Sequence, residues 1–280
     1  MTAVYLPAIS VSPSYPHPLS FKRRRFTGVV KLKCLSASSQ VDIENNYYDT
    51  RIHWEKFYDL HQNKFFKDRH YLEKDWGQYF YDDNANGRLI LFEAGCGAGN
   101  TIFPLAKSYP QLFVHACDFS HHAISLVKSN PKFREDQMNV FVCNIAEDNL
   151  CDHVASASVD VVTLVFTLSA VSPEKMPTVI QNIRCVLKPN GHVLLRDYAV
   201  GDYAQEMLIK KNQVISENLY FRGDGTSSFY FSEDHLSNLF VTAGFSLVDV
   251  NTYNREIKNR ARNITMQRFL FLLISSESNG

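Results

Sequence analysis

The feature that most constrains how this chain can fold is a glycine-rich turn directly after a short apolar run. The run ends in Glu93, and glycine then occupies every second position, at Gly95, Gly97 and Gly99. Glycine lets a backbone turn tightly and approach a ligand closely. Since a helical pattern begins at Asn100, the segment predicts a strand, a nucleotide-type binding loop and a helix, in that order.

Strand and helix patterns alternate through the rest of the chain. Runs rich in β-branched and aromatic residues predict strands, and apolar residues three and four positions apart predict helices. The expected strands cover residues 88–93, 112–117, 139–143, 159–166 and 191–198, and the expected helices cover residues 100–108, 120–129, 173–187 and 232–243. This alternation predicts an α/β fold with a doubly wound, Rossmann-like, mostly parallel sheet. Residues 245–253 and 266–274 are expected to close it as an antiparallel C-terminal pair.

The spacing of the glycines indicates which ligand the loop holds. A dinucleotide loop requires glycine three residues after Gly97, where this chain has Asn100. The pattern E-x-G-x-G-x-G suits a ligand without a pyrophosphate, such as S-adenosyl-L-methionine. Asp118 ends the second expected strand, where its carboxylate could accept hydrogen bonds from both ribose hydroxyls. With the sequence LKPNG leading into the fifth strand, these features predict a class I methyltransferase sheet that holds this cofactor at Gly95, Gly97 and Asp118.

The first 40 residues do not resemble part of a fold. Residues 1–39 contain four prolines, seven serines and six basic side chains but no acid, and no uninterrupted apolar core follows the basic cluster. This composition is typical of an organellar transit peptide, with a plain disordered tail as the alternative. We expect residues 1–40 to be a disordered leader that directs the protein to an organelle. The segment VKLKC at residues 30–34 favours the chloroplast over the mitochondrion; without a working leader the protein would be cytoplasmic.

The leader also unbalances the charge of the chain. It holds six of the 29 basic residues and none of the 29 acidic ones, so residues 40–280 carry a formal net charge of −6. A nucleic-acid enzyme usually has a basic footprint, so this chain must gather its basic residues locally or borrow those of a partner. The six cysteines form no C-x-x-C pair and no apolar run reaches 18 residues. We therefore expect neither a metal site nor a membrane segment.

Residues 41–87 predict an N-terminal helical cap ahead of the methyltransferase domain, which we expect at residues 88–280. Aromatic side chains recur at helical spacings in this segment, and a turn cluster, DDNANG, precedes the first strand. Trp54 and Tyr58 are about one helical turn apart on one face, a spacing that would also serve a buried core stripe.

Blocks outside the glycine loop resemble one family. The blocks are WEKFY at residues 54–58, FFKDRH at 65–70, LFEAGCGAGN at 91–100, ACDFS at 116–120, LSAV at 168–171, LRDY at 195–198 and DGTSSFYF at 224–231. In these blocks the chain resembles the eukaryotic methyltransferase-like enzymes that form 3-methylcytidine in tRNA, and the resemblance covers residues 45–268. It implies methylation, dependent on S-adenosyl-L-methionine, of the cytidine at position 32 in the anticodon loop of certain tRNAs.

The resemblance also implies cofactor contacts. It places Trp54 and Tyr58 over the cofactor, and the family's other contact positions correspond to Gly95, Asp118, Asn144, Ile145 and Val165. The family usually has Asp where this chain has Asn144, at the contact to the adenine amino group. The carbonyl oxygen of Asn144 can still accept, so we expect weaker binding that Asn144→Asp would tighten. The family also continues with a Trp-bearing strand where this chain has the apolar run FLFLLI at residues 269–274.

Methylation at cytosine N3 requires alignment more than acid–base chemistry, because that nitrogen is neutral and carries a lone pair. The site must extrude the base and stabilise a cationic product. Asp197, at the end of the fifth expected strand, is the first candidate for the stabilising carboxylate; the alternative is a structural ion pair with Arg196 or with a neighbouring helix terminus. Arg69 and His70 in the FFKDRH block are the other catalytic candidates, although a lone histidine is more often structural.

Two basic segments are candidates for tRNA backbone contacts. Lys67 and Arg69 belong to the FFKDRH block, whose alternative role is an aromatic latch with solvated charges. The second segment lies near the C-terminus and contains Arg255, Lys258, Arg260 and Arg262. An ordinary solvated hairpin is the alternative for that stretch.

Three functions remain open from the sequence. The first is a tRNA cytidine methyltransferase, which the FFKDRH and RDY blocks favour. The second is a class I methyltransferase acting on a small molecule or a protein. The third is a non-catalytic member of the family that supports another subunit. This possibility stays open because Asn144 replaces the family's Asp and because residues 40–280 carry a net negative charge. The expected partner is tRNA, with a tRNA synthetase or another accessory protein as a further candidate.

Overall fold

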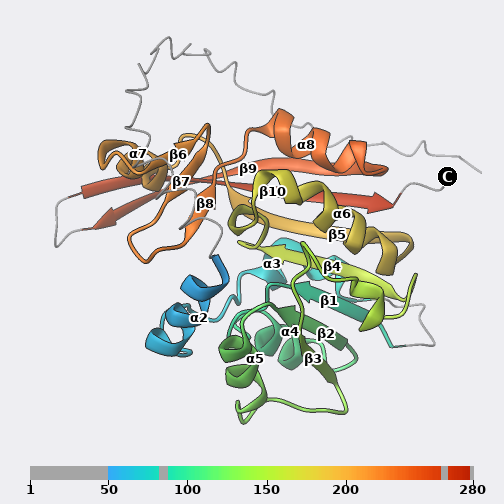
Figure 1. Cartoon of the computed structure of the whole chain (residues 1–280). Helices are drawn as coiled ribbons and strands as arrows, with labels where there is room; N and C mark the ends of the chain where they lie inside the picture. The colour runs from blue at the N-terminus through green and yellow to red at the C-terminus, as the bar shows by residue number, and fades with distance from the viewer. Residues whose placement is uncertain (1–49, 82–87, 260–263, 278–280) are drawn as a thin grey trace, which may run out of the picture.

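The computed structural model describes residues 50–81, 88–259 and 264–277 (Figure 1). Within these residues, seven strands form one sheet in the order β3-β2-β1-β4-β5-β10-β9. The first five along the chain pair in parallel, and β10 is antiparallel to both β5 and β9. The strands are β1 (Ile90–Ala94), β2 (Phe113–Asp118), β3 (Met138–Val142), β4 (Val159–Val165), β5 (Leu187–Tyr198), β9 (Phe245–Asn259) and β10 (Ile264–Glu277). The predicted doubly wound, mostly parallel sheet with antiparallel C-terminal strands is confirmed.

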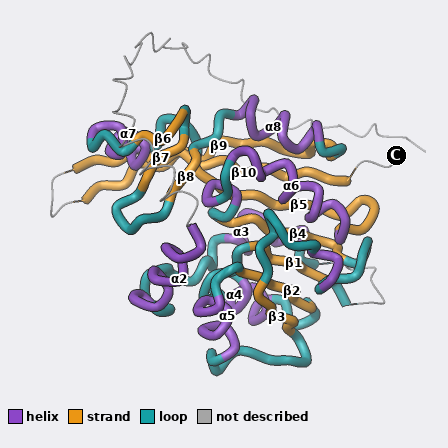
Figure 2. Tube along the Cα trace, viewed as in Figure 1, coloured by secondary structure: helices purple, strands orange, loops and turns teal. Residues whose placement is uncertain are grey.

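Figure 2 shows helices on both sides of this sheet. One hydrophobic core contains the buried faces of α6 and α8, and a second contains those of α3, α4 and α5. Successive side chains of β1 join different cores, Leu91 the second and Phe92 the first, because side chains alternate along a strand. The helices are α3 (Leu72–Trp76), α4 (Ile102–Ser108), α5 (His121–Lys128), α6 (Met176–Val186) and α8 (Glu233–Thr242).

A small antiparallel sheet and one helix are inserted after β5. The elements are α7 (Tyr203–Lys210), β6 (Val214–Ser216), β7 (Leu219–Phe221) and β8 (Ser227–Phe229). Buried Asp202 joins this insertion to the main sheet: it caps α7 by accepting from Ala204 N at 2.7 Å and also accepts from Arg268 Nε at 2.8 Å and Phe269 N at 3.0 Å. Arg268 is thereby committed to an internal ion pair.

The C-terminal hairpin is longer than the sequence predicted. The antiparallel pairing of residues 245–253 with 266–274 is confirmed, but β9 continues beyond the end of its expected range and β10 beyond both ends of its own. Residues 251–258 are exposed, so they have no buried face to impose alternation on the sequence. The apolar run at 269–274 lies in β10 between two other strands, which explains why Phe271 and Leu273 are buried.

The predicted helix at residues 173–187 and the start of the fifth strand also differ. Pro173–Lys175 forms a 3₁₀ turn (η4) and α6 ends at Val186. The sequence LKPNG, expected to lead into the fifth strand, lies inside β5, where Asn190 has a φ of 64°. Asparagine is one of the few residues that adopt this left-handed conformation readily.

Some expectations fall on residues outside the described ranges. The expected leader at residues 1–40, and both Arg260 and Arg262, are among them. Among the helices that the structure does describe, none is both long enough and apolar enough to cross a membrane.

One carboxylate attaches helix α2 (Thr50–His61) to the start of α5. Glu55 accepts hydrogen bonds from Ser120 Oγ at 2.8 Å, His121 N at 2.7 Å, His122 N at 3.1 Å and His122 Nδ1 at 2.7 Å. Burial alone would raise the pKa of Glu55, but these hydrogen bonds outweigh it and lower the pKa from 4.5 to about 2. The ionised carboxylate therefore caps α5 from another helix.

Replacing Glu55 with Gln should destabilise the protein in a pH-dependent way. At neutral pH we expect a loss of about 1–2 kcal/mol in the free energy of unfolding, the range for a lost helix cap. Because the folded pKa lies below 4.5, the stabilisation is present above that pH and disappears as the pH falls toward 2. Urea unfolding at pH 7 and pH 3 would measure this, with exposed Glu206→Gln on α7 as the control. If the difference in the free energy of unfolding between the wild type and Glu55→Gln stays constant down to pH 3, the capping role is contradicted.

Candidate cofactor and substrate site

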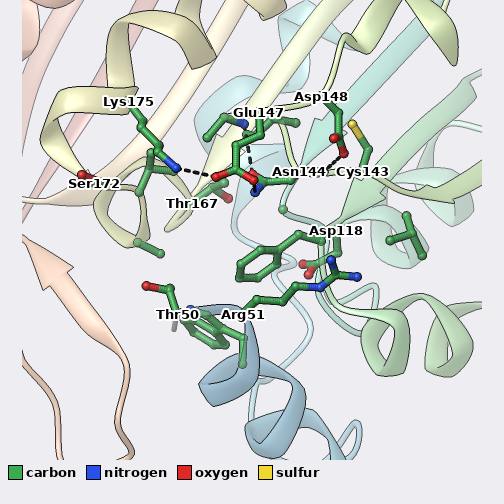
Figure 3. A pocket seen from close by; sticks show the side chains of 18 of the residues that line it. Thr50, Arg51, Asp118, Cys143, Asn144, Glu147, Asp148, Thr167, Ser172 and Lys175 are labelled. Atoms are coloured by element: carbon green, nitrogen blue, oxygen red, sulfur yellow. Dashed lines mark hydrogen bonds and ion pairs between the residues drawn. The ribbon is translucent and has the colours of Figure 1, made fainter. Parts of the chain in front are cut away.

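A cavity of about 410 Å³ lies at the carboxyl ends of the parallel strands (Figure 3). The segments that follow β1, β2, β3 and β4 contribute Gly95, Asp118, Asn144 and Thr167 to its wall, and helix α2 contributes further side chains. The chain runs outward from β1 to β2 and β3 and then returns to β4 on the other side of β1. Ligands of open α/β sheets bind at such a reversal of strand order.

The glycine loop is closely packed between the sheet and α2. Gly95 and Gly97 have φ values of 68° and 54°, which favour glycine. A Cβ at Gly97 would lie 2.6 Å from Tyr58 Oη, and one at Gly95 would lie 2.5 Å from Thr167 Cγ2. These side chains leave no room for a Cβ, so glycine is required at both positions, and the main chain at Gly95 itself forms part of the cavity wall.

Asp118 supplies a buried carboxylate to this cavity. Its Oδ2 accepts from Gly97 N at 2.9 Å, and its Oδ1 accepts from Ser120 N at 3.0 Å. Each carboxylate oxygen can accept a second hydrogen bond, so two donor hydroxyls of a ribose could still be bound. Burial raises the pKa of Asp118 from 3.8 to about 6, against the lowering effect of the backbone hydrogen bonds.

A second cavity, of about 260 Å³, shares a wall with the first. The shared residues are Trp54, Tyr58, Gly95, Phe166 and Ala170. Basic and aromatic side chains, including Lys67, Arg69, Tyr71, Tyr198 and Arg222, also line the second cavity. The arrangement suits a cofactor on one side of the shared wall and a planar, electron-rich acceptor on the other.

Comparisons with known proteins agree with this geometry. Residues 92–193 match the model of a methyltransferase domain. The tRNA N(3)-methylcytidine methyltransferase trm141 of Schizosaccharomyces pombe is 38% identical over 84% of this chain and 95% of its own length. Human tRNA N(3)-cytidine methyltransferase METTL6 is 42% identical over 79% of this chain and 78% of its own length. The chain belongs to the tRNA N3-cytidine methyltransferases.

Solved structures confirm the fold of this family member at low sequence identity. A SAM-dependent methyltransferase from Anabaena variabilis matches with a TM-score of 0.61 and 15% identity, over 81% of this chain and 95% of that one. One from Methanosarcina mazei matches with a TM-score of 0.56 and 17% identity, over 70% of this chain and 95% of that one. The prediction of a class I methyltransferase with S-adenosyl-L-methionine as cofactor is confirmed at the level of the family.

The structure brings most of the expected cofactor residues together. Trp54 and Tyr58 stack with ring centroids 5.9 Å apart on α2 and reach both cavities. Asn144 and Ile145 line the first cavity. Gly97 and Val165 line the second cavity instead, although Gly97 also binds the Asp118 carboxylate.

Arg69 points inward rather than toward solvent. Its Nη1 donates to Thr101 Oγ1 at 3.0 Å and to the carbonyl of Val165 at 3.1 Å, and its guanidinium lies 5.5 Å from the centre of the Phe166 ring. Its backbone N donates to the carbonyl of Asn100 at 2.9 Å. These contacts attach the FFKDRH loop to the far end of the glycine loop. His70 is exposed and lines neither cavity.

Asp197 is fully buried behind the second cavity and is absent from its wall. Its Oδ2 accepts from Ser169 N at 2.9 Å and its Oδ1 from Tyr198 N at 2.9 Å. Burial raises the pKa of Asp197 from 3.8 to about 6. The alternative pairing with Arg196 does not occur, because Arg196 binds Asp75 at 2.5 Å.

Arg255 and Lys258 lie far along the hairpin and line neither cavity. Both side chains are exposed, and Lys258 forms an ion pair with Glu256 at 3.2 Å. Any tRNA contact they make is thus peripheral to the two cavities.

Sequence reasoning missed several residues of the site. Phe166 has a φ of 58°, a conformation rarely adopted by aromatic residues and often found at functional sites. Glu147 and Lys175 also line the first cavity and form an ion pair across 28 positions of sequence. The position of Phe166 at the end of a valine-rich strand could have drawn attention to it, whereas no local signal pairs Glu147 with Lys175.

Asp118→Ala should weaken cofactor binding. Loss of charged hydrogen bonds to the ribose should cost on the order of 1.5–3 kcal/mol, or roughly 10- to 150-fold in Kd. Since the pKa of Asp118 is about 6, wild-type affinity should fall as the pH drops below 6, and the variant should lack this dependence. Calorimetry between pH 5 and pH 8 would measure both, with exposed Asp136→Ala as the control. Unchanged affinity in a folded variant would refute the role.

Proposed function

We propose that this chain transfers a methyl group from S-adenosyl-L-methionine to N3 of a cytidine in tRNA, at position 32 of the anticodon loop. The observation that carries the proposal is the wall shared by the two cavities. A cofactor in the first cavity and an extruded base in the second would meet across Gly95 and Phe166. The relatives named for this reaction match most of the chain.

Bound S-adenosyl-L-methionine would supply an electrophilic methyl group on a sulfonium. The protein's task is then alignment and exclusion of water. Phe166 and Tyr198, with ring centroids 5.0 Å apart, offer aromatic faces on which an unstacked base could stack. No residue has to remove a proton, because cytosine N3 carries none.

Asp197 would act on this reaction without touching the base. Its carboxylate accepts from the backbone N–H groups of Ser169 and Tyr198, two residues that line the second cavity, and with a pKa of about 6 it is mainly ionised at physiological pH. Its negative charge would favour the cationic 3-methylcytosine product over the neutral base. In this proposal it is a positioning and electrostatic residue.

Unmodified tRNA incubated with the protein and S-adenosyl-L-methionine should accumulate 3-methylcytidine. Mass spectrometry of nucleosides would detect the product, and nuclease fragments would locate it. A tRNA with uridine at position 32 should give none, and the Asp118→Ala variant should give much less. A different methylated nucleoside, or product in the uridine-32 control, would contradict the proposal.

A tRNA synthetase or another accessory protein is proposed as a source of additional tRNA affinity. The support is electrostatic: residues 40–280 carry a formal net charge of −6, and Arg196 and Arg268 are committed to internal ion pairs. Addition of candidate synthetases should then raise the rate at limiting tRNA more than the rate at saturating tRNA.

An organellar, preferably chloroplast, location is proposed from the composition of residues 1–40. Residues 1–45 fused to a fluorescent protein should direct it to the chloroplast, because the segment is rich in serine and arginine and lacks acids before Asp42. Microscopy of transfected plant cells would show the location, with Arg23, Arg24 and Arg25 replaced by Glu as the control. A diffuse cytosolic signal from the unaltered fusion would contradict the transit function.

A further inference from the structure

The turn after β3 forms one side of the cofactor cavity and is organised around Asn144 (Figure 3). The Asn144 backbone N donates to Asp148 Oδ2 at 2.7 Å, and its carbonyl accepts from Glu147 N at 2.9 Å and Asp148 N at 2.8 Å. Its side-chain Oδ1 accepts from Ala146 N at 3.1 Å. The acceptor atom of residue 144 therefore already stabilises the turn.

The remaining polar atom of Asn144 orients a carboxylate. Its Nδ2 donates to Glu147 Oε2 at 2.9 Å, and Lys175 Nζ contacts Glu147 Oε1 from the η4 turn. Each Glu147 oxygen thus has one donor and retains the capacity to accept another hydrogen bond. Glu147 and Lys175 both line the cavity, and Figure 3 shows Glu147 across it from Thr50 and Arg51.

The purine of the cofactor has an exocyclic amino group, which is a donor. A carboxylate is an acceptor only, so it distinguishes an amino group from a carbonyl, whereas an amide can rotate to serve either. In this chain two carboxylates of the turn line the cavity, at positions 147 and 148, and Asp148 accepts from the Asn144 backbone N. The amide at position 144 is engaged with Ala146 and with Glu147, which it orients together with Lys175.

We propose that Glu147, positioned by Asn144 and Lys175, is the residue that recognises the amino group of the cofactor's adenine. The inference rests on the proposed function in that the cavity holds S-adenosyl-L-methionine. It reverses the expectation from sequence that Asn144→Asp tightens binding. An Asp at 144 would replace the Nδ2 donor, 2.9 Å from Glu147 Oε2, with a second carboxylate.

Two ligands that differ at this edge of the purine provide the test: S-adenosylhomocysteine and S-inosylhomocysteine, in which a carbonyl replaces the amino group and N1 carries a hydrogen. Calorimetry should show that the wild-type protein prefers the adenosyl compound by on the order of tenfold. Glu147→Gln should reduce the preference to about twofold, because an amide can turn its N–H toward the carbonyl. Glu174→Gln is the matched control, since Glu174 is near Lys175 in the same turn but outside the cavity wall.

A double-variant cycle separates the two positions. Asn144→Asp alone should bind S-adenosylhomocysteine no more tightly than the wild type. Asn144→Asp with Glu147→Gln should recover affinity, because the amide removes the clash of two carboxylates, but it should keep the weak preference of Glu147→Gln. Tighter binding by Asn144→Asp, or an unchanged preference in Glu147→Gln, would overturn the inference and leave residue 144 as the contact. Equal wild-type affinity for both ligands would overturn the inference alone, whereas failure to bind S-adenosylhomocysteine would overturn the proposed function as well.

Discussion

The desolvation of three carboxylates at the carboxyl edge of the sheet is the constraint on which this site depends. Burial raises the pKa of Glu93 to about 7 and those of Asp118 and Asp197 to about 6. A buried ionised carboxylate is tolerated only where hydrogen-bond donors satisfy it. Backbone N–H groups of the loops after β1 and β4 donate to the two aspartates, and Thr163 Oγ1 donates to Glu93 Oε2, whereas Glu93 Oε1 has no hydrogen-bond partner among the described residues. The acids thereby help fix the loops that form the cavities.

The contributions of these three acids to stability change with pH in the opposite direction to that of Glu55, which attaches α2 to α5. The three buried acids have folded pKa values above their ordinary ones, so their contribution to stability decreases as the pH rises from about 4 to 7. Glu55 has a lowered pKa, so its contribution is lost only as the pH falls below about 4.5. In their ionised forms, the buried acids of the sheet therefore reduce the stability of the folded protein, whereas ionised Glu55 of the covering helix α2 increases it. Trp54 and Tyr58 of that helix belong to both cavities, so the docking of α2 shapes the cofactor and substrate sides together.

Several cations that could have faced tRNA are used inside the protein. Arg69 holds the FFKDRH loop to Thr101, Arg196 lies between Tyr71 and Tyr253 and binds Asp75, and Arg268 binds Asp202. Arginine suits such positions because its planar guanidinium combines several donors with stacking on aromatic rings. The number of basic residues in such an enzyme therefore does not show how many of them contact nucleic acid, because some form internal ion pairs and hydrogen bonds.

The sequence by itself determined the fold class, the position of the cofactor loop and the family. These follow from local features: strand and helix periodicity, glycines that only a special backbone conformation requires, and blocks such as FFKDRH. It also predicted Asp118 from the end of its strand, and the family resemblance pointed to Trp54 and Tyr58; all three side chains line the cavities. Only the tertiary structure decided which polar side chains reach a ligand. The inward course of Arg69, the burial of Asp197 and the ion pair of Lys175 with Glu147 depend on partners distant in the chain. Hydrogen-bond partnerships of this kind depend on how strands and helices pack, and that information is absent from local sequence patterns.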